Sequence, residues 1–262
     1  GNILRTGTVI RLHPRTMRVN VVGRLGPGLR SKDIILRIIS QLGTDSGSGY
    51  AVEYAGPVVR ALPQEARFTI CNLAVEMASL TGMVGPDDTT FEYLRGRARA
   101  PEGADWEAAV ADWLSLATDD DAVFDHEIML DGADIVPHVS WGTNPGQVIG
   151  IDGSVPDPDD IDDPGASESA ARALEYMGLS AGTPIRDIAI DTVFIGSCTN
   201  GRIEDIRAVA AVAAGRHVKE GIRTLVVPGS GAVKAQAEAE GIPAILTAAG
   251  FDWREPGCSM CL

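Results

Sequence analysis

The sequence predicts an α/β fold in which the sheets are mainly parallel. Near its start, an alternating strand pattern at 16–25 leads into a helix with an apolar stripe. Over the last eighty or so residues, short apolar runs alternate with helices. A parallel strand pair needs a crossover connection, which is usually a helix, so this alternation favours parallel sheets.

The first half of the chain predicts one strand and three helices. Alternating apolar residues indicate the strand at 16–25. Ser31 is expected to cap a helix whose apolar stripe stops at Gly43. A second helix is predicted over 64–82 and a short third one over 106–116.

The second half predicts a series of short strands and helices. We place a domain boundary at residues 125 and 126, which gives two α/β domains, 1–125 and 126–262. The run 157–164, rich in Asp and Pro, predicts a solvated acidic loop. Strands are expected at 127–130, 191–196, 224–227, 244–246 and 251–253, and helices at 202–214 and 232–240.

Composition excludes several classes of function. The chain has 22 basic and 36 acidic residues, a net charge of −14, which disfavours a nucleic-acid partner. Its longest apolar runs, such as Ala208–Ala214, are far shorter than the roughly 20 residues of a membrane span, so no membrane partner is expected. Four cysteines are too few for a disulfide scaffold and indicate thiols in a reducing cytoplasm.

Three of these cysteines are candidate metal ligands. Cys198 lies in a glycine-rich turn between a predicted strand and helix, while Cys258 and Cys261 follow the last predicted strand. Loops after parallel strands of one sheet lie side by side, so three thiolates could converge. Three thiolates suit an iron–sulfur cluster with one open iron, whereas structural zinc takes four ligands. Cys71 could be that fourth ligand, but its place on the apolar side of a helix favours a core role.

Several segments resemble a known family in their order along the chain. They span about residues 16–262 and are Ser31–Leu36 (SKDIIL), Tyr50–Gly56 (YAVEYAG), Thr69–Glu76 (TICNLAVE), Pro86–Phe91 (PDDTTF), Gly196–Asp205 (GSCTNGRIED), Val227–Ser230 (VPGS) and Pro256–Leu262 (PGCSMCL). This set resembles the aconitase superfamily, and within it the large subunits of 3-isopropylmalate dehydratases. The resemblance implies three-layer α/β/α domains with mainly parallel sheets.

The resemblance also implies an activity and a cofactor. Such hydro-lyases dehydrate and rehydrate a 2-hydroxy dicarboxylate, here expected to be 2-isopropylmalate in leucine biosynthesis, and so move its hydroxyl to the neighbouring carbon. By motif, Cys198, Cys258 and Cys261 become ligands of a [4Fe–4S] cluster whose open iron binds the substrate.

Two further positions match the family near the cluster, and Arg202 is a third candidate because of its place before a helix. Asn72 and Glu76 are expected on one helix face, because they are four residues apart. Arg202 precedes a predicted helix, where a cation opposes the helix dipole. It is expected either to bind a substrate carboxylate or to pair with Glu204 or Asp205.

The resemblance implies a partner and leaves alternatives open. Family members carry an upstream region with acid–base groups, and a small swivelling-domain subunit supplies further substrate contacts, so we expect this chain alone to be inactive. The loop Gly43–Tyr50 differs from the more glycine-rich family loop, which leaves another substituted malate or homocitrate open as substrate. A cluster-free, non-catalytic protein and a zinc module are further alternatives. We assign no role to the four histidines.

Overall fold

The computed structural model describes residues 2–8, 12–197 and 199–258. The chain divides into two compact units, Gly1–Arg186 and Asp187–Leu262, and each is described by itself. Both units contain parallel sheets with helices, which confirms the predicted α/β class. The division does not fall at the predicted boundary of 125 and 126, because the strand that begins at His126 joins the first unit's sheet.

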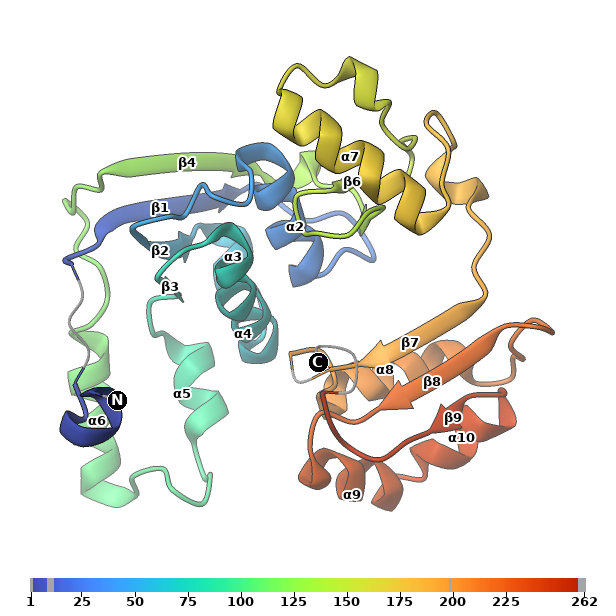
Figure 1. The fold of residues 1–262 in the computed structure, drawn as a ribbon. Coiled ribbons are helices and arrows are strands. Elements are labelled where there is room, and N and C mark those ends of the chain that lie inside the picture. The colour runs from blue at the N-terminus through green and yellow to red at the C-terminus, as the bar shows by residue number, and fades with distance from the viewer. Residues whose placement is uncertain (1, 9–11, 198, 259–262) are drawn as a thin grey trace. The chain divides into compact units, whose positions relative to one another are not determined.

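Unit 1 is built on a four-stranded parallel sheet with the order β3-β2-β1-β4 (Figure 1). The strands are β1 (Arg15–Val22), β2 (Tyr50–Ala55), β3 (Thr81–Met83) and β4 (His126–Asp131). The register aligns Val19 with Tyr54 on one side and with Ile128 on the other. These aligned residues point to the same face of the sheet, and all three are buried in the core of this unit.

Helix α2 (Ser31–Leu42) packs its apolar stripe into that core. Ile34, Ile35, Ile38 and Ile39 are almost fully buried, as the spacing predicted. The helix ends where predicted, at Gly43, whose φ of 89° is left-handed. Ser31, however, is the first helical residue and not the N-cap: the N-cap is Arg30, whose backbone N–H donates to Asp33.

The helix expected over 64–82 is shorter than predicted. Helix α4 (Gln64–Leu73) gives way to a 3-10 turn, η1 (Ala74–Met77), and Ala78 is left-handed with φ of 59°. The chain then enters β3, where Gly82 packs against Cys71 and Ala74 so closely that a Cβ would lie 2.8 Å from the Ala74 side chain. The apolar pattern continues past the helix end because Ala74 and Met77 of the 3-10 turn are buried in the same core.

The rest of unit 1 contains a two-stranded antiparallel sheet, which is an exception to the parallel pattern. Its strands are β5 (His138–Ser140) and β6 (Val148–Gly150). Helix α7 (Pro164–Met177) was not predicted, because the acidic run before it suggested only a loop. The last Asp of that run, Asp163, caps the helix by accepting from the backbone N–H of Ala166 at 2.7 Å.

The other elements of unit 1 are short, apart from α6, which has 12 residues. They are α1 (Asn2–Thr6), α3 (Pro57–Arg60), α5 (Asp88–Leu94), α6 (Gly103–Leu114), η2 (Gly132–Asp134), η3 (Pro158–Asp160) and η4 (Ile185–Asp187), the last of which reaches the division between the units. Among the residues described, none of the helices has both the length and the apolar character that a bilayer span requires.

Unit 2 is a three-stranded parallel sheet with the order β7-β8-β9. The elements are β7 (Thr192–Gly196), α8 (Ile203–Ala213), β8 (Arg223–Val227), α9 (Gly231–Ala239), α10 (Ile242–Ala248) and β9 (Asp252–Trp253). The strand predicted at 244–246 is wrong, because these residues form the middle of α10. Leu246 is fully buried there among the helices and Val226.

Candidate functional site

The loops that follow the strands of unit 2 meet at one edge of its sheet. The backbone N–H of Gly229, after β8, donates to the carbonyl of Gly201 at 2.8 Å. On the other side, the N–H of Gly257, after β9, donates to the carbonyl of Pro228 at 3.2 Å. The loop after β8 therefore contacts both neighbouring loops, as expected for the carboxyl ends of parallel strands.

Glycines allow these loops to approach each other. A Cβ on Gly201 would lie 2.5 Å from the carbonyl oxygen of Ser197 and 2.9 Å from the nitrogen of Gly229. A Cβ on Gly196 would lie 2.4 Å from the carbonyl oxygen of Val227. Ser197 itself has a φ of 88°, a conformation that non-glycine residues rarely adopt. The turn is thus held in a strained conformation by close backbone packing, a feature typical of functional sites.

Cys258 lies at this edge, one residue after the hydrogen bond that ties Gly257 to Pro228. Its thiol is free and half-buried. Cys198 and Cys261 fall outside the described residues, so the convergence of the three thiols stays a prediction. Within the described residues, no three His, Cys, Asp or Glu side chains are grouped closely enough to hold a metal ion.

The described part of this edge fits an iron–sulfur cluster. It offers a thiol, the donor that such clusters take, and backbone packed without intervening side chains beside it. Residue 198 is a second predicted ligand and stands between Ser197 and Gly201 in the sequence. The carbonyl of Gly201 accepts a hydrogen bond from Gly229 of the neighbouring loop.

Arg202 is the N-cap of α8. Its backbone N–H donates to the Oδ2 atom of Asp205 at 3.1 Å, so Asp205 satisfies a main-chain donor at the helix start. This contact involves the main chain of Arg202 and does not decide between the two roles predicted for its side chain.

Asn72 and Glu76 do not share a helix face, so that prediction is wrong. Asn72 is exposed in the last turn of α4, whereas Glu76 is half-buried in the 3-10 turn that follows. Because a 3-10 turn rotates the chain by a different angle per residue than an α-helix, the i, i+4 relation is lost. The two side chains line different cavities: Asn72 that of Cys71 and Gly82, and Glu76 a larger one.

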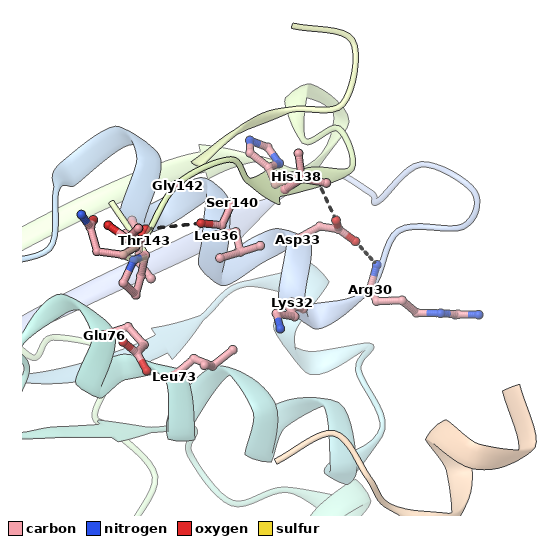
Figure 2. A pocket seen from close by; sticks show the side chains of 14 residues that line it. Arg30, Lys32, Asp33, Leu36, Leu73, Glu76, His138, Ser140, Gly142 and Thr143 are labelled. Carbon is pink, nitrogen blue, oxygen red and sulfur yellow. Dashed lines mark hydrogen bonds between the residues drawn. The ribbon is translucent and has the colours of Figure 1, made fainter. Parts of the chain in front are cut away.

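The larger cavity has a volume of about 730 Å³ and lies within unit 1. Its walls come from the start of α2, the Leu73–Glu76 segment and the β5–β6 hairpin (Figure 2). The lining residues are Arg30, Lys32, Asp33, Leu36, Ile39, Leu73, Glu76, His138, Val139, Ser140, Gly142, Thr143, Asn144 and Pro145. A cavity of this size, with apolar and polar walls, is within the range of small-molecule sites.

Asp33 joins two walls of this cavity through backbone hydrogen bonds. Its Oδ1 atom accepts from the N–H of His138 at 3.0 Å, and its Oδ2 atom accepts from the N–H of Arg30 at 2.8 Å. Burial lowers the pKa of His138, and Arg37 lowers it further, while the Val136 carbonyl and Asp33 oppose the shift. The lowered pKa therefore favours the uncharged form of the His138 ring at neutral pH.

The sequence interpretation missed Lys32 and His138 as cavity residues. One signal was present for Lys32: it lies in the first turn of α2, where a cation is disfavoured by the helix dipole. The position of His138 depends on the β5–β6 hairpin, which brings it to α2 from more than one hundred residues away. No local pattern reveals such a contact.

Cys71 has the environment of a core thiol. It packs against the hydrophobic core of unit 1, and burial raises its pKa to about 11 although Arg67 opposes the shift. A thiol that resists ionisation is a poor metal ligand, because metals bind the thiolate. This environment supports the predicted core role over that of a fourth ligand.

Parallel α/β units with glycine-lined loops after their strands, and a thiol at that edge, define a class of ligand-binding α/β proteins. The chain matches the model of the aconitase family (aconitate hydratase) over residues 2–262, and it belongs to this family. The members of the family are hydro-lyases, and they typically bind an iron–sulfur cluster. The sequence resemblance to this family is thereby confirmed.

Proposed function

We propose that the chain is the large subunit of a 3-isopropylmalate dehydratase. In this role it isomerises 2-isopropylmalate to 3-isopropylmalate by dehydration and rehydration, in leucine biosynthesis, together with a small swivelling-domain subunit. The observation that carries the proposal is the edge of unit 2, where Cys258 follows the loop that is hydrogen-bonded to the turn containing residue 198. The ordered segments named above support this particular substrate within the family.

Cys198, Cys258 and Cys261 would hold a [4Fe–4S] cluster, which supplies an open iron as a Lewis acid for the leaving hydroxyl. The glycines of the unit 2 turns let the loops after neighbouring strands pack closely, which would keep the ligand-bearing loops together. Arg202, at the start of α8, would provide a cation for a substrate carboxylate. Glu76, with its carboxylate on the larger cavity, would accept a proton or a substrate hydrogen bond. Asn72, which lines a different cavity of unit 1, would offer a further polar contact.

The cluster ligands are tested by anaerobic reconstitution with iron and sulfide. We expect about four irons per chain, and an electron paramagnetic resonance signal after oxidation or reduction. Cys198→Ser, Cys258→Ser and Cys261→Ser should each lose most of the iron. Cys71→Ser is the matched control and should retain it, because Cys71 packs against the core of unit 1.

Two results would contradict this ligand set. Retention of the cluster in the three variants would exclude their thiols as ligands. One zinc per chain, with all four cysteines protected from alkylation, would favour the zinc alternative instead.

The substrate is tested separately, with the complete gene product, an intact cluster and the small subunit. Turnover of 2-isopropylmalate in preference to citrate, homocitrate and other substituted malates is the expected result. If the intact cluster supports turnover of another member of this panel only, the assigned substrate is wrong but the hydro-lyase class stands. No turnover of any of them would favour a non-catalytic role.

A further inference from the structure

We propose that the 730 Å³ cavity of unit 1 is a binding site for a branched hydroxy-carboxylate, with Lys32 as the carboxylate-binding residue and Leu36 and Leu73 as the surface for the alkyl branch. The choice of 2-isopropylmalate as the ligand rests on the proposed function. The cavity itself is defined by the geometry of unit 1 alone.

Lys32 supplies the available positive charge. It lies on the first turn of α2, and none of the ion pairs found among the described residues includes it. The carboxylate beside it, Asp33, is already engaged by the backbone N–H groups of Arg30 and His138. In Figure 2 the Arg30 side chain extends away from Glu76 and Ser140, whereas Lys32 lies between the walls. A ligand carboxylate would therefore meet Lys32.

The apolar part of the lining lies next to this cation. Leu36 is one turn along α2 from Lys32, so the two side chains share a face of the helix. Leu73, at the end of α4, lies on the facing wall in Figure 2, and both leucines are half-buried. A short alkyl branch placed between them would lose its contact with water, which favours a substituted malate over malate.

The remaining polar groups suit a hydroxyl. The carboxylate of Glu76 lies on the Leu73 wall and forms no hydrogen bond found among the described residues, so it can accept from a ligand hydroxyl. On the hairpin wall, the hydroxyl of Ser140 donates weakly to the carbonyl of Asn144, at 3.3 Å. Because the pKa of His138 is lowered, its ring carries less positive charge at pH 7 than an ordinary histidine and competes less with Lys32 for the anion.

The test is calorimetric titration of the chain, without cluster reconstitution, with 2-isopropylmalate, malate and 4-methylpentanoate. Malate lacks the branch, and 4-methylpentanoate has a branch but lacks the hydroxyl and one carboxylate. We expect 2-isopropylmalate to bind about tenfold or more tightly than either. Lys32→Met should weaken the binding of 2-isopropylmalate about tenfold or more. Leu36→Ala should reduce the affinity for 2-isopropylmalate to nearly that for malate.

Lys219→Met is the matched control. Lys219 is exposed in unit 2, and its substitution changes the net charge by the same amount without altering the cavity. Thermal unfolding identifies a misfolded variant; if Lys32→Met fails to fold, Lys32→Gln takes its place. The proposal is overturned if 2-isopropylmalate does not bind, if malate binds as tightly, or if the Lys32 and Lys219 variants bind equally. The cluster is absent from this titration, so a lack of binding would not decide the turnover test of the proposed function. Likewise, a lack of turnover would not decide whether this cavity binds the ligand.

Discussion

Arg67 and Asp87 form a two-pronged ion pair that ties α4 to the start of α5. The Nη1 and Nη2 atoms of Arg67 lie 2.6 and 2.8 Å from the two carboxylate oxygens of Asp87. The guanidinium, only 1% exposed, also donates to the carbonyls of Leu62 and Arg60. Asp87 caps α5 through the N–H of Thr90, so one carboxylate connects a buried cation and a helix start.

Arg67→Met should destabilise unit 1 by about 3 kcal/mol, because it removes four hydrogen bonds and leaves two carbonyls unpaired inside the protein. Arg207→Met is the matched control. Arg207 makes a comparable pair with Glu240, but its guanidinium is 47% exposed whereas that of Arg67 is 1% exposed, so its loss should cost much less. Urea unfolding followed by tryptophan fluorescence measures both, and equal losses would contradict the importance of burial.

Asp87 should also make unit 1 sensitive to acid. Burial raises the pKa of Asp87, but the hydrogen bonds and charge of Arg67 outweigh this and hold it below the usual value of 3.8. Its stabilising contribution is therefore present above that value and is lost as the pH falls through the lower pKa of the folded state. Asp87→Asn should flatten the dependence of unfolding free energy on pH below about 4. A dependence unchanged from the parent protein would show that other carboxylates dominate.

Gly201 should tolerate no side chain. In Gly201→Ala the new Cβ would meet the Ser197 carbonyl and the Gly229 nitrogen, both part of the backbone, so the loops must separate. We expect a loss of about 1–3 kcal/mol in stability and a reduced iron content after reconstitution. Gly231→Ala is the control, because nothing lies within 4 Å of a Cβ there, and it should be neutral or slightly stabilising. Normal iron content in Gly201→Ala would show that the loop contact does not support the cluster site.

The elements that periodicity predicted well are those whose burial is local. The apolar stripe of α2 and the strand β7 lie close to their predicted bounds, because each repeats a pattern over its own length. Residues 244–246 were predicted as a strand, but three consecutive apolar residues fit a strand or a buried helix equally well. They form a helix because Leu246 packs against its neighbours in α10, α8 and β8. The break after Leu73 is tertiary in origin, since Gly82 of β3 packs against Cys71 and Ala74.

The candidate functional residues likewise include some that the sequence could predict and some that it could not. The convergence of the unit 2 loops followed from strand order alone, because parallel strands place their carboxyl ends together. The cavity of unit 1 could not be predicted, since it combines residues of α2 with a hairpin distant in sequence, such as Asp33 with His138. Side chains that meet only through long-range packing leave no periodic signal.

His138 should contribute to stability in a way that depends on pH. Because its pKa is lowered in the folded protein, the neutral ring is favoured there, and the contribution is complete above about 6.5, the usual value for histidine. It is lost as the pH falls through the folded pKa. Nuclear magnetic resonance titration should give a pKa below 6.5, and His138→Gln should reduce the loss of stability between about pH 7 and 5. His13→Gln, which alters an exposed ring, is the control.

Cys71 should be the slower of the two described thiols to react with iodoacetamide. Burial raises its pKa from 9.0 to about 11, so at pH 8 its reactive thiolate is about a hundredfold rarer than without the shift. Peptide mapping by mass spectrometry after timed alkylation of the cluster-free chain compares Cys71 with the half-buried Cys258. The difference should disappear in urea, because unfolding removes the burial that causes it. Alkylation of Cys71 at the rate of Cys258 in the folded chain would contradict a core environment and return Cys71 to the candidate metal ligands.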